Sequence, residues 1–479
     1  MSQTPPDPQD DLSTKERSAE AGSPSDLDLS GHDVHLQTDF VQDVVDAVRH
    51  SDGERATALV ADLPLPDLAD LFEVLPPSDR RSLAALTGET LDPAFLSELE
   101  GQVFTDVVRQ LPATLVAEAV RQLDTDDAIA VIEELNEDVQ NQVLRRLAAA
   151  DRVVIEEGLS YPEESAGRIM QRDLVAVPQF WTVGHTIDYL RAENETLPDD
   201  FYEIIVTDPF HRPVGVVPLS RVMRSERQVK IGSIMTRDPH LIDVMDDQED
   251  VAYQFNKYHL ISAAVIDASR RLVGVITVDD IVHVVEQEAQ EDILALAGVS
   301  EGNVNESLLT MTRSRFTWLF VNLGTAILAS MVIGRFEATI QELVALAVLM
   351  PIVASMGGNA GTQTMTVAVR ALAMKDLSAA NALRIVNKEL LVSLINGVLL
   401  AFVIGGVAII WFGNAMLGAV LGIAMVINLV VAGLSGILVP MTLDRLGVDP
   451  AVSSSVFVTT ITDVVGFLAF LGLSAAVLL

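Results

Sequence analysis

The spacing of apolar residues changes twice along this chain of 479 residues and divides it into three parts. From about residue 38 to 150, apolar positions recur with the period of an α-helix. Between about 165 and 288, short β-branched runs alternate with helical segments, and from 316 onward the chain is strongly apolar. The pattern predicts a multidomain α/β protein followed by an all-α membrane domain.

The N-terminal residues 1–37 carry no such pattern. They are rich in Pro, Asp and Ser and poor in apolar residues, a composition that cannot form a packed core. We expect a disordered acidic tail, with no signal peptide.

Dipeptides that begin with leucine, such as Leu111-Pro112 and Leu123-Asp124, recur every 12 residues in the helical part. A short helix of about two turns and a polar break fill this repeat, so 38–150 is predicted to stack short helices into a small superhelix. The repeating leucines are Leu63, Leu75, Leu111, Leu123, Leu135 and Leu147.

The α/β part contains a second internal repeat. The segment 167–173 is echoed by 232–238, and 212–217 is echoed by 271–276. Two landmarks in the same order at this spacing resemble a tandem pair of CBS domains, which we place at 165–228 and 229–288. The first copy holds about six extra residues near 193–200, and a polar connecting helix is expected over 289–315.

Five apolar segments in 316–479 are each long enough to cross a hydrocarbon core of about 30 Å. They are predicted near 316–334, 343–369, 390–412, 415–441 and 455–479. If the spans alternate, one side receives Arg and Lys from several loops and the other receives only Arg335. This positive-inside bias predicts a cytoplasmic N-terminus and an external C-terminus in a cell membrane.

The charge is as unevenly distributed as the apolar residues. The formal net charge is −36, of which −35 falls in 1–315. An acidic half of this kind repels nucleic acid and concentrates cations; general solubility is the alternative explanation. The absence of cysteine excludes disulfides and thiolate metal sites.

One carboxylate, Asp463, lies in the last apolar span with no other charge nearby. A charge at membrane depth costs roughly 3–15 kcal/mol, so water, a counter-ion or a partner must reach it. Thr459 lies one helical turn earlier and presents a hydroxyl on the same face. We predict an aqueous cation path; the alternative is a buried Asp bonded to Asn322, Asn396 or Asn428.

The second span carries a Pro and a glycine cluster followed by two amides. Pro351 removes a backbone donor, and glycines let a helix unwind or let another helix approach closely. The polar and glycine positions that we assign to the ion path are Gly357, Gly358, Asn359 and Gln363. The alternative is a glycine-mediated packing seam.

The domain order, together with the motifs at 356–361 and 462–464, resembles the MgtE family of magnesium channels and transporters over about residues 40–479. The resemblance implies a homodimer in a lipid bilayer whose subunit interface forms a Mg²⁺ pore, closed when Mg²⁺ binds to the cytoplasmic half. By resemblance, the regulatory metal positions are Asp126, Asp247, Glu249, Asp280, Glu288 and Glu291. A largely hydrated Mg²⁺ needs only oxygen ligands, and the spans contain no His or Cys.

Other functions stay open at this point. Where the family often has aspartate, this chain has Ala130, His259 and His283, which bears on metal affinity and pH sensitivity. Thr277 and Asp280 fit the CBS pattern for adenosine ribose, so ATP is a second candidate ligand. The rival functions are transport of Co²⁺ or Mn²⁺ and a membrane-anchored nucleotide sensor without transport; no residue constellation suggests an enzyme.

Overall fold

The computed structural model describes residues 38–88, 90–192, 197–198, 201–299, 308–377 and 380–479. The chain forms two compact units that divide between Leu91 and Asp92, inside the predicted helical domain 38–150. Most of the predicted insertion near 193–200 lies outside the described residues. The two units are described separately.

The described part of the first unit contains four helices around a core that includes Leu71 and Phe72. The fully buried Arg80 is satisfied by backbone carbonyls, because its Nε donates to the Phe72 oxygen at 2.7 Å. The helices are α1 (Thr38–Arg49), α2 (Gly53–Val60), α3 (Leu65–Val74) and α4 (Pro77–Thr87).

The second unit begins with more short helices, and these confirm the 12-residue repeat. Each repeating leucine precedes an extended N-cap residue from which the next helix starts. The last helix continues beyond the predicted limit at 150, to Ser160. The elements are η1 (Pro93–Glu98), α5 (Gly101–Val108), α6 (Ala113–Gln122), α7 (Thr125–Glu133), α8 (Glu137–Leu144) and α9 (Ala149–Ser160).

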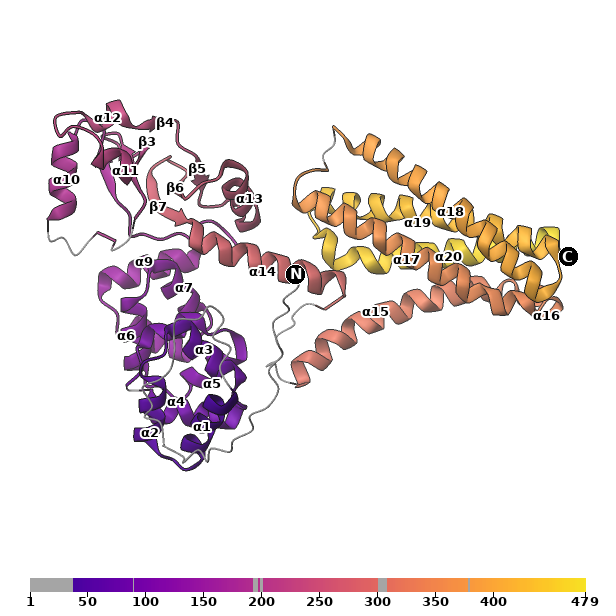
Figure 1. Cartoon of the computed structure of the whole chain (residues 1–479), viewed down its shortest axis with the longest axis horizontal. Coiled ribbons are helices and arrows are strands. Elements are labelled where there is room, and N and C mark those ends of the chain that lie inside the picture. Colours follow the sequence, from indigo (N-terminus) through magenta and orange to yellow (C-terminus); the bar gives the residue numbers. More distant parts are fainter. Residues whose placement is uncertain (1–37, 89, 193–196, 199–200, 300–307, 378–379) are drawn as a thin grey trace, which may run out of the picture. The chain divides into compact units, whose positions relative to one another are not determined.

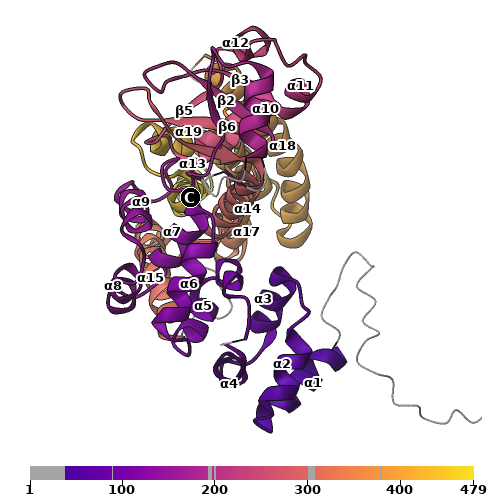
Figure 2. The ribbon, with the colours of Figure 1, turned by 90° about the vertical axis from the view of Figure 1, so that its left-hand side faces the viewer.

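Two small sheets with helices follow, as the CBS pattern predicts (Figures 1 and 2). The first sheet has the order β1-β2-β3-β4 and the second has the order β5-β6-β7. Within each sheet the first pair is parallel and the next is antiparallel. The elements are β1 (Ala176–Pro178), α10 (Val183–Arg191), β2 (Glu203–Thr207), β3 (Pro213–Pro218), α11 (Leu219–Met223), α12 (Ile231–Ile234), β4 (Thr236–Arg237), β5 (Leu241–Asp243), α13 (Gln248–Tyr258), β6 (Ser262–Ile266) and β7 (Leu272–Thr277).

The two repeated landmarks meet crosswise between the sequence copies. Strand β4 comes from the second copy but pairs with β3 of the first, whereas Gln171 of the first copy bridges to Val275 of the second. A Cβ built on Gly274 would meet the Sδ of Met170 at 2.7 Å. The equivalent glycine, Gly215, meets Met235 in the same way, at 2.8 Å. Each sheet is therefore completed by the other copy, and the predicted boundary at 228/229 divides the sequence but not the sheets.

The connector differs from the predicted helix over 289–315. Helix α14 runs from Val278 to Leu296 and thus joins the second CBS copy to the connector without a break. A capping box between Thr277 and Asp280 starts it, and it ends before Gly298, which has a left-handed φ of +72°. The next described helix, α15 (Leu308–Gly334), already contains the first span.

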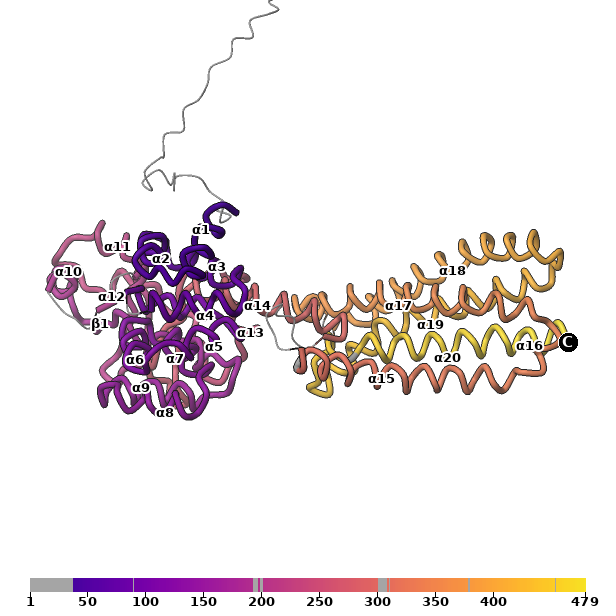
Figure 3. The backbone as a smooth tube through the Cα atoms, turned by 90° about the horizontal axis from the view of Figure 1, so that it is seen from below, coloured from indigo at the N-terminus to yellow at the C-terminus, as the bar shows by residue number. Residues whose placement is uncertain are grey.

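Among the described residues, five helices are long and apolar enough to cross a membrane, which confirms the predicted number. Figure 3 shows these helices side by side. Helix α19 is the most buried and packs against α17, α18 and α20, whereas α15 contacts α20. Helix α17 continues through Pro351 and the glycine cluster without unwinding. The spanning segments are Met311–Gly334, Ala345–Ala373 (α17), Ala382–Phe412 (α18), Ala415–Arg445 (α19) and Ser454–Val477, the last within α20 (Pro450–Val477); the short α16 (Glu337–Glu342) precedes α17.

Candidate ion path and acidic clusters

Asp463 is half-buried on α20, and the described residues offer it no hydrogen bond or ion pair. Thr459, one turn away, donates its hydroxyl to the Ser455 carbonyl at 2.8 Å, so its oxygen remains an acceptor. A Cβ on Gly358 of α17 would lie 4.0 Å from the Thr459 methyl group. The fold thus brings Gly358, Thr459 and Asp463 to one place where α17 faces α20.

The remaining predicted positions of α17 point to two different sides. Asn359 and Gln363 are exposed, whereas Gly357 is buried against α19. A Cβ on Gly357 would lie 2.2 Å from the Asn428 Nδ2. Gly357 therefore belongs to the packing seam that we gave as the alternative, and the amides belong to an exposed face.

That exposed face of α17 is polar along several turns. Hydrocarbon offers no hydrogen bonds to side-chain amides and hydroxyls, so such a face requires water or another protein surface. We call it the polar stripe; it comprises Ser355, Asn359, Thr362, Gln363 and Thr366.

Of the three asparagines that we considered as neutral partners for Asp463, Asn428 has another role. Asn428 is fully buried and donates to the Val353 carbonyl at 2.8 Å, across α19 and α17. Asn322 is half-buried and Asn396 is exposed on α18.

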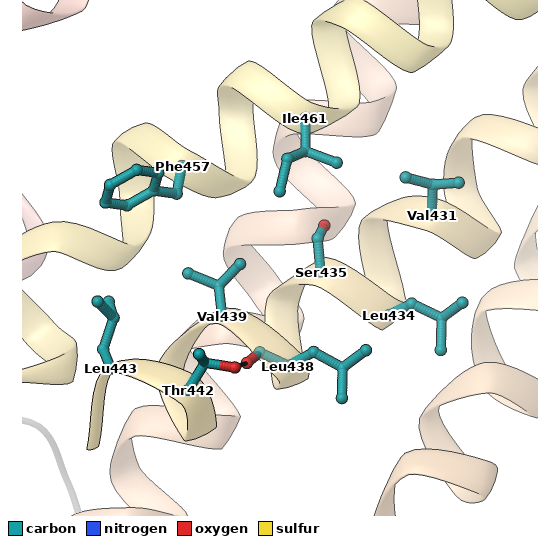
Figure 4. Close-up of a pocket in the computed structure, with 9 residues that line it drawn as sticks. All are labelled: Val431, Leu434, Ser435, Leu438, Val439, Thr442, Leu443, Phe457 and Ile461. Carbon is teal, nitrogen blue, oxygen red and sulfur yellow. Dashed lines mark hydrogen bonds between the residues drawn. The ribbon is translucent and has the colours of Figure 1, made fainter. Parts of the chain in front are cut away.

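An apolar cavity of about 420 Å³ lies between α19 and α20 (Figure 4). Phe457 and Ile461 of α20 face residues of α19 across it. Its hydroxyls are committed to the helix backbone; that of Thr442, for example, donates to the Leu438 carbonyl at 2.6 Å. A cavity with this lining does not suit a hydrated cation.

The first acidic cluster joins the helical part to the second CBS copy through Asp126, Asp127 and Asp280. Burial, followed by the charges of Asp280 and Asp127, raises the pKa of Asp126 well above its usual value. Burial, followed by Asp280, raises the pKa of Asp127 to about 6. The Asp126 Oδ1 is buried without a hydrogen-bond partner among the described residues, so this acceptor is left unsatisfied.

The second acidic cluster surrounds the start of α13 and the middle of α14. It contains four predicted residues and two that we did not predict: Asp247, Glu249, Glu288 and Glu291, with Glu164 and Asp292. Burial, followed by Glu288, raises the pKa of Glu249 to about 7. The Glu288 carboxylate accepts from the Gln248 Nε2 at 2.7 Å. These mutual repulsions make both clusters receptive to cations.

Neither cluster has the ligand geometry of a complete metal site. Within the described ranges, no three His, Asp or Glu side chains are close enough to hold one ion together. Three members of these clusters were not predicted from the sequence: Asp127, Glu164 and Asp292. Asp127 and Asp292 directly neighbour predicted residues, whereas Glu164 precedes the first CBS copy and had no signal.

Thr277 and Asp280, the residues predicted to bind a nucleotide, make hydrogen bonds within the protein in this structure. The Thr277 hydroxyl donates to the Asp280 Oδ2 at 2.6 Å, and the Gln171 Nε2 donates to the same oxygen at 3.0 Å. The contacts between Thr277 and Asp280 cap the start of α14, and the bond from Gln171 links this cap to the first CBS copy. The ATP assignment stays a prediction, as do the roles of His259, which ends α13 with a φ of 53°, and His283, which lowers the pKa of Asp127.

The end of α14 packs on the membrane helices. Ala295 shares a buried cluster with Met365 and Val369 of α17 and with Ala451 and Val458 of α20. Val458 directly precedes Thr459, so the connector contacts the helix segment that carries the candidate ion path.

Comparison with known proteins identifies the family to which this chain belongs. A divalent cation transporter family model matches residues 350–473, the MgtE intracellular N domain matches 63–164, and a CBS domain matches 231–287. The magnesium transporter MgtE of Enterococcus faecalis is 35% identical over 67% of this chain and 71% of its own length. The chain belongs to the MgtE family.

The chain is also similar to two further MgtE proteins. The magnesium transporter MgtE of Bacillus subtilis is 29% identical over 86% of this chain and 91% of that protein. Among solved structures, the cytosolic domain of the Mg²⁺ channel MgtE in complex with ATP covers 51% of this chain and 99% of that chain, at 25% identity and a TM-score of 0.46. The family consists of transporters rather than enzymes, and the five apolar helices make this member a multi-pass membrane protein.

Proposed function

We propose that this chain is a homodimeric channel that conducts Mg²⁺ into the cell and closes when Mg²⁺ binds to its cytoplasmic domains. The observation that carries the proposal is Asp463, a carboxylate in an apolar span for which the described residues supply no partner. A cation in a wet path accounts for its retention there. The relatives named as magnesium transporters support Mg²⁺ as that cation.

The homodimer follows from the polar stripe of α17. In a single subunit the amides of Asn359 and Gln363 would face lipid. A second copy that packs on this side encloses a path between the subunits and supplies a second Asp463. Two carboxylates suit a Mg²⁺ ion that keeps much of its water shell.

The membrane orientation in this proposal places the acidic half in the cytoplasm. The positive-inside bias supports it, as does the packing of Ala295 on one end of the helix bundle. With an inside-negative potential of 100 mV, entry releases about 4.6 kcal/mol for a divalent ion. A path with this driving force needs feedback from the cytoplasm.

The two acidic clusters provide the feedback. Without divalent ions, carboxylates such as Asp126 and Asp280, or Glu249 and Glu288, repel one another. Mg²⁺ ions that bridge them favour the compact arrangement, in which α14 packs against the pore helices. Release of the ions separates the domains and withdraws this contact.

Uptake of Mg²⁺ by proteoliposomes containing the purified full chain tests the conduction step. We expect uptake driven by an inside-negative potential and its loss, by about a hundred-fold or more, in Asp463→Ala. Asp444→Asn, an exposed carboxylate at the end of α19, is the matched control and should conduct normally. Normal Mg²⁺ uptake by folded Asp463→Ala would refute the ion path.

The same vesicles distinguish the rival ions. If Mn²⁺ or Co²⁺ enters and Mg²⁺ neither enters nor competes, the chain transports another divalent cation. If no ion enters, the membrane-anchored sensor becomes the better description.

A further inference from the structure

Asn428 is a buried amide at the junction of three membrane helices. Its side chain is fully inaccessible, and its Nδ2 donates to the Val353 carbonyl of α17 at 2.8 Å. Its Oδ1 is buried and has no hydrogen-bond partner among the described residues. An unsatisfied buried acceptor is unfavourable, so the site keeps this amide at a cost in stability.

Two glycines on the neighbouring helices make room for this amide. A Cβ on Gly357 of α17 would lie 2.2 Å from the Asn428 Nδ2, and a Cβ on Gly466 of α20 would lie 2.7 Å from it. Real Cβ atoms essentially never approach a neighbour so closely. The Asn428 amide therefore sits between the backbones of both helices and holds each at a defined distance from α19.

Both glycines are close in sequence to the candidate ion path. Gly357 adjoins Gly358 and precedes Asn359 by two residues, and Gly466 follows Asp463 by three. A helix turns by about 100° and rises about 1.5 Å per residue. Any shift or rotation of α17 or α20 at Asn428 is therefore passed to Asn359 or Asp463.

We infer that Asn428 is a positioning residue for ion selectivity, whose amide sets the positions of α17 and α20 through its hydrogen bond to the Val353 carbonyl, without touching the ion. The inference rests on the proposed conduction through Asp463. A site that recognises a hydrated ion by its size must hold its oxygens within about 0.5 Å. Asn428 is inaccessible from the path, so its effect passes through the two helices.

The test separates the hydrogen bond from simple space filling. Asn428→Ala removes both, whereas Gly357→Ala with Asn428→Ala returns a Cβ to the vacated space but no donor to Val353. Asn396→Ala, an exposed amide on α18, is the matched control. Each full-length variant is measured in proteoliposomes for the ratio of Mg²⁺ to Co²⁺ uptake, and in detergent for thermal unfolding.

We expect the ratio to fall about five-fold in Asn428→Ala, which corresponds to about 1 kcal/mol, and to stay unchanged in Asn396→Ala. In the double variant, thermal stability should recover while the ratio stays low. If Asn428→Ala does not fold, the refilled double variant decides the question by itself.

The wild-type ratio in Asn428→Ala, or recovery of the ratio in the double variant, would overturn the inference. In both cases wild-type Mg²⁺ uptake would still support the proposed function. Absence of uptake by the wild type would instead refute the proposed function.

Discussion

Lys375, in the turn after α17, forms an ion pair with Asp250 of α13. Its Nζ also lies 5.0 Å from the centre of the Tyr253 ring, within the range of a cation–π interaction. Lys375 holds a left-handed backbone with a φ of 54°, which is unfavourable for a residue with a side chain. One contact therefore ties the second CBS copy to the end of the helix that carries the polar stripe.

We predict that Lys375→Ala weakens closure by Mg²⁺. A half-exposed ion pair of this kind contributes up to about 1 kcal/mol, so half-inhibition of uptake should need up to about five-fold more cytoplasmic Mg²⁺. Lys388→Ala is the control, since Lys388 has no ion pair in the described structure. Restored inhibition in the swap of Lys375→Asp with Asp250→Lys would identify the pair as the cause; an unchanged Lys375→Ala would exclude it.

The acidic clusters predict that, in the absence of Mg²⁺, protonation of their carboxylates partly stabilises the compact arrangement. The pKa of Asp127 is about 6 and that of Glu249 about 7 in the compact arrangement, whereas separated carboxyl groups titrate near 4. Between these values the compact form binds more protons, so its stability falls as pH rises through the window from about 4 to about 7.

Limited proteolysis of the full chain measures this effect. Without Mg²⁺, we expect slower cleavage at about pH 5.5 than at about pH 8, and with excess Mg²⁺ we expect little dependence on pH. Glu249→Gln with Asp127→Asn should reduce the pH dependence, whereas Asp138→Asn, an exposed carboxylate outside both clusters, should leave it intact. Equal cleavage with Mg²⁺ and with EDTA at every pH would contradict the proposed gating.

The glycine seam predicts a large difference between two glycine substitutions. A Cβ on Gly361 of α17 would lie 2.5 Å from the Val458 Cγ1, whereas a Cβ on Gly406 of α18 meets nothing within 4 Å. Gly361→Ala should therefore destabilise the membrane domain by about 1–3 kcal/mol through overpacking. Gly406→Ala should be neutral or slightly stabilising, because alanine favours a helix over glycine by about 1 kcal/mol. Thermal unfolding in detergent compares them, and equal melting temperatures would disprove the seam.

The polar stripe predicts which positions of the membrane domain water reaches. The chain has no cysteine, so single cysteines can be introduced directly. Asn359→Cys should react with a charged thiol reagent, and Mg²⁺ should slow the reaction. Phe402→Cys, whose native side chain is 78% exposed on α18, should stay unreactive because it faces lipid. Equal rates at both positions would argue against a wet path along α17.

The local sequence pattern was sufficient to predict the main structural segments of this protein. The five spans, the 12-residue helical repeat and the paired CBS landmarks all follow from periodicity and composition, which depend on neighbouring residues alone. Asp463 could be singled out for the same reason, because its surroundings in the sequence are uniformly apolar.

Only the tertiary structure decided which of these residues meet. It placed Gly357 in the seam and Asn359 on the exposed face, exchanged the two CBS landmarks between the sheets, and extended α14 across the predicted connector boundary. It also added Asp127, Glu164 and Asp292 to the acidic clusters. These contacts join residues far apart in the chain, and packing between helices and domains determines them. Sequence periodicity shows which face of an element is apolar, but not which other element covers that face.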